Sequence, residues 1–282
     1  MFKKISAFII IVLISIQIPS IVPLSTARQV TKNSEVYKPK IENTSGLVDV
    51  ATEFSPLFVK TANGMKKMIE GVIDFRKKSL ISYREKFSKL ALKQFPDVLF
   101  VACCDSRVVP NIFVSSCPGD LFVLRNIGNL IPVYPSRGNC KIDASVAAAI
   151  EYSLLNLKVG HIVICGHSEC GAMKSLLKKG SKTTYLDMWL KHAKSSYKRF
   201  KNCISKSTNL TQCNLLSRIN VLQQMDNLKT YPLVMELIQK NKLKIHGWWF
   251  DLATADVYYW KSKSEKFILI DEDSVKDFMK HF

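Results

Sequence analysis

Residues 98–107 read VLFVACCDSR, and residues 162–171 read IVICGHSECG. Each stretch begins with a short run that is apolar throughout and then passes into residues that can bind a metal. Runs without polar alternation are typical of strands that are covered on both faces. Because parallel strands present their functional groups just beyond their carboxyl ends, the two stretches predict neighbouring strands with a site at their shared edge.

Around these stretches, short apolar runs alternate with helical patterns. Residues 121–124 and 245–250 are further strand candidates. Residues 144–157 and 217–240 carry apolar side chains at helical spacing, and Tyr231-Pro232 interrupts the second of these. Such alternation is the signature of strand, crossover helix and parallel strand. We therefore predict an alpha/beta domain with a mainly parallel central sheet flanked by helices, and a surface excursion at residues 202–212.

Residues 47–92 predict a helical extension that precedes the sheet. Its apolar positions form one face until Arg76-Lys77-Lys78 interrupts it, and they are Met65, Met68, Ile69, Val72, Ile73 and Phe75. We expect this face to pack on another part of the protein or on a partner subunit.

The first residues have the order of a secretory signal peptide. Lys3 and Lys4 precede an uncharged apolar run at residues 5–24, and Ser25-Thr26-Ala27 supplies small residues for cleavage after Ala27. Export to the periplasm or secretion is the expected result. A retained membrane anchor at residues 5–24 is the alternative, because this run is long enough for a hydrocarbon core of about 30 Å. The chain then divides into a signal peptide at 1–27, an extended polar arm at 28–45 and one domain at 46–282.

Composition excludes several broad classes of protein. Hydrophobic residues make up 47% of the 282 residues, which is enough for a normal core and argues against disorder. The net charge of +18 comes from scattered basic residues, so it favours a solvated basic surface over a nucleic-acid patch. Eight cysteines are too few for a disulfide scaffold at this length. Cys203 and Cys213 could form a bridge in an exported protein or remain two free thiols.

The two strand ends carry the ligands of a catalytic zinc site. His167 and Cys170 are three residues apart where a helix is predicted to begin, so both can reach one point, and Cys103 or Cys104 can supply a third ligand from the neighbouring strand. Zinc accepts imidazole and thiolate together, and three protein ligands leave its fourth position open for water. Asp105 would close that position unless Arg107 held it away by paired hydrogen bonds, in which case it can orient the water.

Residues 103–108 resemble the C-x-D-S-R signature of the beta-class carbonic anhydrases, and residues 151–171 resemble the second signature of that family. Residues 119–122 and 125–129 fall where the family carries its second strand and the loop after it. The resemblance extends from about Leu47 to Asp251. It implies zinc-dependent, reversible hydration of carbon dioxide to bicarbonate and a proton, with one zinc per subunit of a homodimer or higher oligomer.

The resemblance also assigns individual roles. The family's ligand stands two places before the aspartate, which selects Cys103 over Cys104, with His167 and Cys170 as the other ligands and Asp105 and Arg107 as catalytic residues. Similarity to the plant-like branch implies a substrate pocket made of Gln94, Phe122, Ile127, Tyr152 and Gly171. Another branch carries tryptophan and glycine where this chain has Phe100 and Ala102, so we expect this protein to lack that branch's regulatory bicarbonate site.

Two other functions compete with this reading. The same zinc site could hydrolyse carbon disulfide or carbonyl sulfide behind a narrower entrance. A zinc-stabilised module for nucleic acid would instead need a closed four-ligand site, and the Asp105–Arg107 pair would have no purpose in it. We therefore expect no nucleic-acid partner, and contact with a membrane only if residues 5–24 are retained.

Overall fold

The computed structural model describes residues 64–135, 143–178, 183–203 and 210–279. The predicted signal peptide, the predicted arm and the beginning of the 47–92 helical region lie outside these described residues. Within them, no helix has both the length and the apolar character needed to cross a membrane.

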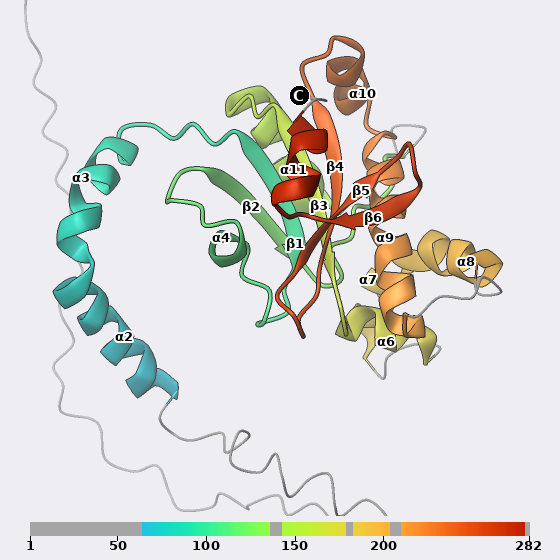
Figure 1. Ribbon diagram of the computed structural model, residues 1–282, viewed down its shortest axis with the longest axis horizontal. Coiled ribbons are helices and arrows are strands. Elements are labelled where there is room, and N and C mark those ends of the chain that lie inside the picture. Colours follow the sequence, from blue (N-terminus) through green and yellow to red (C-terminus); the bar gives the residue numbers. More distant parts are fainter. Residues whose placement is uncertain (1–63, 136–142, 179–182, 204–209, 280–282) are drawn as a thin grey trace, which may run out of the picture. The chain divides into compact units, whose positions relative to one another are not determined.

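The strands form a single mixed sheet, shown in Figure 1, with the order β2-β1-β3-β4-β5-β6. Its strands are β1 (Val98–Cys103), β2 (Leu121–Asn126), β3 (His161–His167), β4 (Lys244–Phe250), β5 (Val257–Lys261) and β6 (Lys266–Leu269). The first four are parallel, while β5 and β6 add on as antiparallel strands. The predicted alpha/beta domain with a mainly parallel sheet is therefore confirmed.

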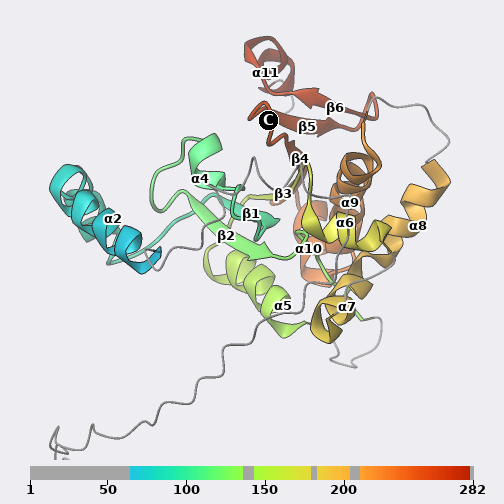
Figure 2. The ribbon, with the colours of Figure 1, turned by 90° about the horizontal axis from the view of Figure 1, so that it is seen from below.

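Helices cover both faces of the parallel strands. In order along the chain, the helices of the described residues, including α2 and α3 that precede the sheet, are α2 (Gly64–Lys78), α3 (Leu80–Leu90), α4 (Pro110–Phe113), α5 (Ala144–Glu151) with the π-helical turn η2 (Tyr152–Asn156), α6 (Gly171–Leu177), α7 (Thr184–Leu190) with the short η3 (Lys191–Ala193), α8 (Lys194–Cys203), α9 (Gln212–Leu228), α10 (Pro232–Gln239) and α11 (Glu272–Met279). Figure 2 shows α4 and α5 on opposite sides of β1 and β2.

Side-chain alternation along β1 and β3 gives the sheet two buried faces. Leu99 and Val101 of β1, with Ile162 of β3, face a buried cluster that includes residues of α5, α9 and α10. Phe100 and Val163 face the other side, where residues of α4 and of the loop after β4 pack on them. Because β1 and β3 are buried on both faces, their sequences have no polar alternation, which is why they could be recognised in the sequence.

Helix ends follow local sequence signals. The Asp143 carboxylate accepts hydrogen bonds from the backbone amides of Ser145 and Val146 and so caps α5. Pro232 stands in the first turn of α10, so the predicted break at Tyr231-Pro232 is where a new helix begins. Of the predicted excursion at 202–212, residues 202–203 belong to the end of α8 and residue 212 begins α9, while residues 204–209 lie outside the described residues.

Helices α2 and α3 bury no residue within the described protomer. The apolar face predicted from the sequence is present on α2 and exposed, with Met65 at 70% and Met68 at 66% exposure. An apolar helical face of this kind is normally covered by a partner element. The described residues of this one chain do not cover it.

Candidate metal centre

The ends of two adjacent parallel strands bring three ligand atoms together. Cys103 is the last residue of β1, His167 is the last residue of β3, and Cys170 precedes α6 as its N-cap. One ligand atom from each residue lies within 4.8 Å of the others, and all three residues are buried. This is the only group of three or more potential metal ligands found among the described residues.

The imidazole of His167 is oriented for a ligand at Nε2. Its Nδ1 lies 2.8 Å from the carbonyl oxygen of Ser168, so Nδ1 carries the proton and donates it to that carbonyl. Nε2 is buried and has no hydrogen-bond partner among the described residues. A buried polar atom without a partner is costly, and a metal ion at this nitrogen removes that cost.

The two cysteines form a donor set that suits a soft divalent cation. The neighbouring Cys170 thiol, with the His167 imidazole and the Gly128 amide close by, holds the pKa of Cys103 well below its ordinary value. The neighbouring Cys103 sulfur, together with burial, raises the pKa of Cys170. Thiolates with an imidazole are ligands that zinc prefers, and both cysteines would bind a metal as thiolates.

Asp105 is held by Arg107 in a paired arrangement. Arg107 Nε donates to Asp105 Oδ1 at 2.9 Å, Arg107 Nη2 donates to Oδ2 at 2.7 Å, and the Arg107 backbone amide adds a third contact to Oδ1 at 3.1 Å. These hydrogen bonds lower the pKa of Asp105 to about 2. The carboxylate therefore stays charged and bound to Arg107, and it does not join the group of three ligands.

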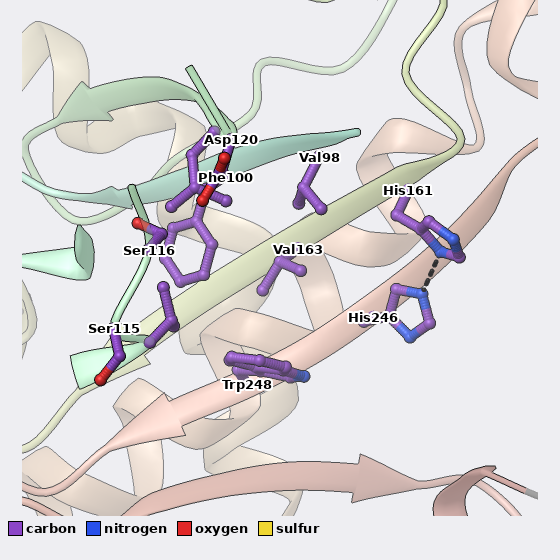
Figure 3. A pocket seen from close by; sticks show the side chains of 11 residues that line it. Val98, Phe100, Ser115, Ser116, Asp120, His161, Val163, His246 and Trp248 are labelled. Atoms are coloured by element: carbon purple, nitrogen blue, oxygen red, sulfur yellow. Dashed lines mark hydrogen bonds between the residues drawn. The ribbon is translucent and has the colours of Figure 1, made fainter. Parts of the chain in front are cut away.

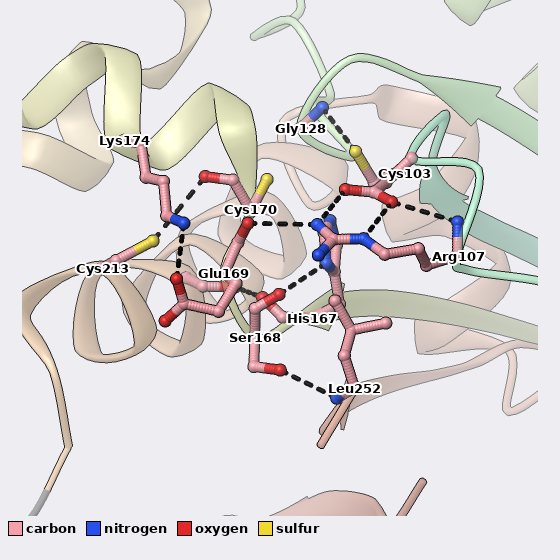
Figure 4. A network of polar contacts seen from close by, with 12 residues as sticks. Cys103, Arg107, Gly128, His167, Ser168, Glu169, Cys170, Lys174, Cys213 and Leu252 are labelled. Carbon is pink, nitrogen blue, oxygen red and sulfur yellow. Dashed lines mark hydrogen bonds and ion pairs between the residues drawn. The ribbon is translucent and has the colours of Figure 1, made fainter. Parts of the chain in front are cut away.

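A surrounding network fixes the loops that carry these residues, and Figure 4 shows one part of it, in which the Leu252 amide donates to Ser168 Oγ. Ser217 Oγ donates to the carbonyl oxygen of His167 at 2.7 Å, and Ser168 Oγ donates to Asp251. Helix α9 comes close enough for the first contact because residue 166 is glycine, where a Cβ would lie 2.7 Å from Val221 Cγ2. The ring orientation of His167 is thus set by its neighbours.

Arg125 and Gly128 were not predicted as site residues, although both lie in the segment that resembled the family's second strand and loop. Arg125 Nη2 donates to the carbonyl oxygens of Cys103 at 2.9 Å and Asp105 at 2.7 Å. The Gly128 amide lies 3.3 Å from Cys103 Sγ. A glycine in the loop after a strand was the one sequence signal for this contact.

Cys104 lies outside the ligand group. It is exposed, whereas Cys103 is 4% exposed, as expected for neighbouring residues that point to opposite sides of an extended chain. Cys203 and Cys213 are free thiols in the structure, and the Cys213 thiol donates to the carbonyl oxygen of Cys170 at 3.6 Å.

The predicted substrate residues fall into two places. Ile127 stands beside Gly128, and Gly171 follows Cys170 directly, so both belong to the metal end of the sheet. Phe122 lies four residues before Asn126, the partner of Cys103, or about 13 Å back along the strand. It pairs with Tyr152 at a ring distance of 5.7 Å, and Tyr152 lines a cavity of about 600 Å³ with Gln94. One protomer does not bring these three residues to its own metal centre.

Another cavity, of about 390 Å³ and shown in Figure 3, lies against the same strands nearer their beginnings. Phe100, Val163 and Trp248 line it, and His161 Nδ1 lies 3.1 Å from His246 Nε2 at one end. None of the predicted metal ligands or substrate residues lines this cavity.

Comparison with known proteins identifies the family. Residues 98–257 match the model of the carbonic anhydrase family. The chain is 38% identical to a carbonic anhydrase of Synechococcus elongatus over 75% of this chain and 77% of that protein. It is 34% identical to one of Pseudomonas aeruginosa over 74% and 93%. The solved beta-carbonic anhydrase CcaA superposes with a TM-score of 0.67 at 36% identity, covering 73% of this chain and 98% of CcaA.

A mainly parallel sheet carries at its carboxyl edge a buried group of two cysteines and one histidine, a donor set typical of zinc sites that keep one position open. With the matches above, the chain belongs to the beta-class carbonic anhydrases. It catalyses the reversible hydration of carbon dioxide to bicarbonate and uses zinc as its cofactor.

Proposed function

We propose that Cys103, His167 and Cys170 hold the catalytic zinc and that Asp105 and Arg107 keep its fourth position available to water. The observation that carries this assignment is the convergence of the three buried ligand atoms within 4.8 Å while both oxygens of Asp105 are bound by Arg107. Zinc at this position supplies the Lewis acidity that makes a water molecule acidic enough to act near neutral pH.

The residues of the chain then have separable tasks. The carbonyl oxygen of Ser168 accepts a hydrogen bond from His167 Nδ1 and so orients the ring, while Ser217 Oγ donates to the carbonyl oxygen of His167 and so fixes its backbone. Arg107 binds the Asp105 carboxylate, keeps it away from the three proposed metal ligands and keeps it ionised. Oδ2 of Asp105 accepts one hydrogen bond from Arg107, whereas Oδ1 accepts two. Oδ2 therefore keeps a second lone pair with which it can accept a hydrogen bond from water and orient that water toward carbon dioxide.

Cys103→Ser tests the assignment, and Cys104→Ser is its matched control one residue away. We expect Cys103→Ser to lose both zinc and carbon dioxide hydration, measured by metal analysis and stopped-flow kinetics on a chain that starts at Arg28. Cys104→Ser should keep both, because its side chain lies outside the ligand group. Full activity in Cys103→Ser would refute the ligand assignment. Parallel assays with carbon disulfide and carbonyl sulfide test whether the site accepts these substrates.

We propose that the enzyme is a homo-oligomer and that Gln94, Phe122 and Tyr152 serve the metal centre of a second copy. These residues lie away from the metal end of their own sheet. They could therefore contact a substrate only at the metal centre of another copy of the chain. The exposed apolar face of α2 offers a surface for such a contact. Solved tetrameric beta-carbonic anhydrases from Sordaria macrospora are 30% identical with a TM-score of 0.61, covering 70% of this chain and 96% of theirs.

Charge placed on that face tests the assembly. Ile69→Asp together with Val72→Asp should yield monomers in analytical ultracentrifugation and lower activity, while the zinc content stays at the wild-type value. Lys66→Asp with Glu70→Lys exchanges the charges of an exposed i,i+4 pair on the same helix and is the control. Active monomers of the aspartate variant would refute the shared site.

We also propose that residues 1–27 direct export and are removed, on the strength of the basic, apolar and small-residue order in the sequence. The mature protein should then begin at Arg28. Amino-terminal sequencing of the protein from cell fractions tests this, and an intact Met1 in the membrane fraction would favour the anchor instead.

A further inference from the structure

The peptide group that joins Ile127 to Gly128 links an indole to the metal centre. Its N–H, which belongs to Gly128, lies 3.3 Å from Cys103 Sγ. Its C=O, which belongs to Ile127, accepts a hydrogen bond from Trp189 Nε1 at 2.7 Å. Figure 4 shows the contact between Gly128 and Cys103. The indole and the sulfur therefore bind opposite ends of one amide.

This amide has little freedom to turn. Gly128 has a φ of +80°, and a Cβ on it would lie 3.0 Å from the Cβ of Ala172, so only glycine suits the position. The next peptide is held as well, because Asn220 Nδ2 donates to the Gly128 carbonyl oxygen at 3.0 Å and Asn220 is buried. Trp189 itself packs against the main core cluster. Two carbonyl contacts thus set the direction of the Gly128 N–H.

Hydrogen bonds in such a chain strengthen one another. A donor on the carbonyl oxygen draws charge through the amide and makes its N–H a better donor. A stronger N–H bond to a thiolate withdraws charge from the sulfur and fixes its position, which are the two means by which surrounding groups tune a metal ligand. The indole of Trp189 is placed to do both to Cys103 without touching it.

We propose that Trp189 is a positioning residue of the metal centre, acting through the Ile127–Gly128 peptide on the sulfur of Cys103. The inference rests on the proposed role of Cys103 as a zinc ligand. It assigns a function to a side chain of α7, which contributes no residue to the ligand group.

Three variants of the full-length enzyme separate the donor from the bulk of the ring. Trp189→Phe keeps an aromatic ring and removes the N–H. Trp189→His keeps an N–H at the corresponding ring position and removes the six-membered ring. Trp260→Phe is the matched control, since Trp260 lies in β5 and packs on Phe267.

The readouts are the zinc dissociation constant, from competition with a chromophoric chelator, and the sulfur-to-metal charge-transfer bands of the cobalt-substituted protein. Trp189→Phe should bind zinc about tenfold more weakly, because the loss of a fixed position for the Cys103 sulfur outweighs its gain in charge; this is the lower end of the range for residues that support metal ligands. Its charge-transfer band should move to longer wavelength, because the sulfur retains more charge. Trp189→His and Trp260→Phe should stay close to the wild type.

Zinc affinity and cobalt bands in Trp189→Phe equal to those of the wild type would overturn the proposal. An equal loss in Trp189→His would also overturn it, because ring volume rather than the donor would then be responsible. If Trp189→Phe does not fold, Trp189→His alone decides, since wild-type values support the donor and a loss contradicts it. Absence of sulfur-to-cobalt bands in the wild type would instead disprove the ligand assignment of Cys103.

Discussion

Replacing Arg107 by alanine should close the metal centre without unfolding the protein. Arg107 makes three hydrogen bonds to the carboxylate of Asp105, and its two guanidinium contacts at 2.9 and 2.7 Å are charge-assisted. Such bonds contribute about 1.5–3 kcal/mol each when shielded. Because the Arg107 side chain is 54% exposed, solvent screening reduces the total, and we take about 2 kcal/mol for the pair. That free energy corresponds to a factor of about 30 in the equilibrium between Asp105 held by Arg107 and Asp105 released from it.

The expected result for Arg107→Ala is a loss of about 30-fold or more in kcat/KM for carbon dioxide hydration, with zinc retained. The reason is that a released Asp105 carboxylate, close to the ligand group, can itself bind the metal and displace water. Stopped-flow kinetics and metal analysis provide the numbers, and a crystal structure of the variant shows where Asp105 lies. Arg199→Ala, which removes an exposed pair with Asp226, is the control and should be unchanged. A fully active Arg107→Ala enzyme with Asp105 still turned away would refute the reasoning.

Three further outcomes follow from buried groups. Burial, with His161 and Lys244 nearby, lowers the pKa of His246 to about 4, so its neutral form gives stability above pH 6.5 that is lost as the pH falls toward 4. The full effect on the free energy of unfolding is about 3 kcal/mol. Urea titrations should show that this free energy falls less steeply with decreasing pH in His246→Gln than in the wild type, and equal slopes would contradict the assignment. Burial raises the pKa of Tyr231 to about 12, so stability should fall as the pH rises from 10 to 12. Tyr231→Phe loses the bond to the Pro132 carbonyl oxygen, about 1 kcal/mol at pH 8, but should lack this alkaline slope; an unchanged slope would count against the assignment. Removing zinc with a chelator should lower the melting temperature, because His167 Nε2 is left buried without a partner. Added zinc should restore the melting temperature. A melting temperature that does not depend on zinc would contradict metal binding at this site.

The core strands and the group of candidate metal ligands could be predicted from sequence because their signals are local. Strands β1 and β3 are buried on both faces, so they appear as continuous apolar runs. Cys103, His167 and Cys170 follow those runs directly, and parallel pairing alone brings the strand ends together. The antiparallel strands β5 and β6 were not predicted. They are short and lie at one edge of the sheet, where the pairing of β5 with β4 and of β6 with β5, rather than a distinct apolar run, specifies them.

The rest of the site depends on contacts that sequence spacing does not contain. Arg125 reaches Cys103 across 22 residues, and Trp189 reaches Ile127 across 62. Neither contact has a local signature. The depth of Phe122 along β2 likewise follows from strand register, and register separates it from the metal end of its own sheet.

X-ray absorption at the zinc edge of the purified enzyme tests the metal centre most directly. One zinc per chain is expected, with two sulfur neighbours at about 2.3 Å and two nitrogen or oxygen neighbours at about 2.0 Å, one of them exchangeable. A third sulfur around the ion, or a fourth protein ligand that no small anion displaces, would contradict an open position held by Cys103, His167 and Cys170.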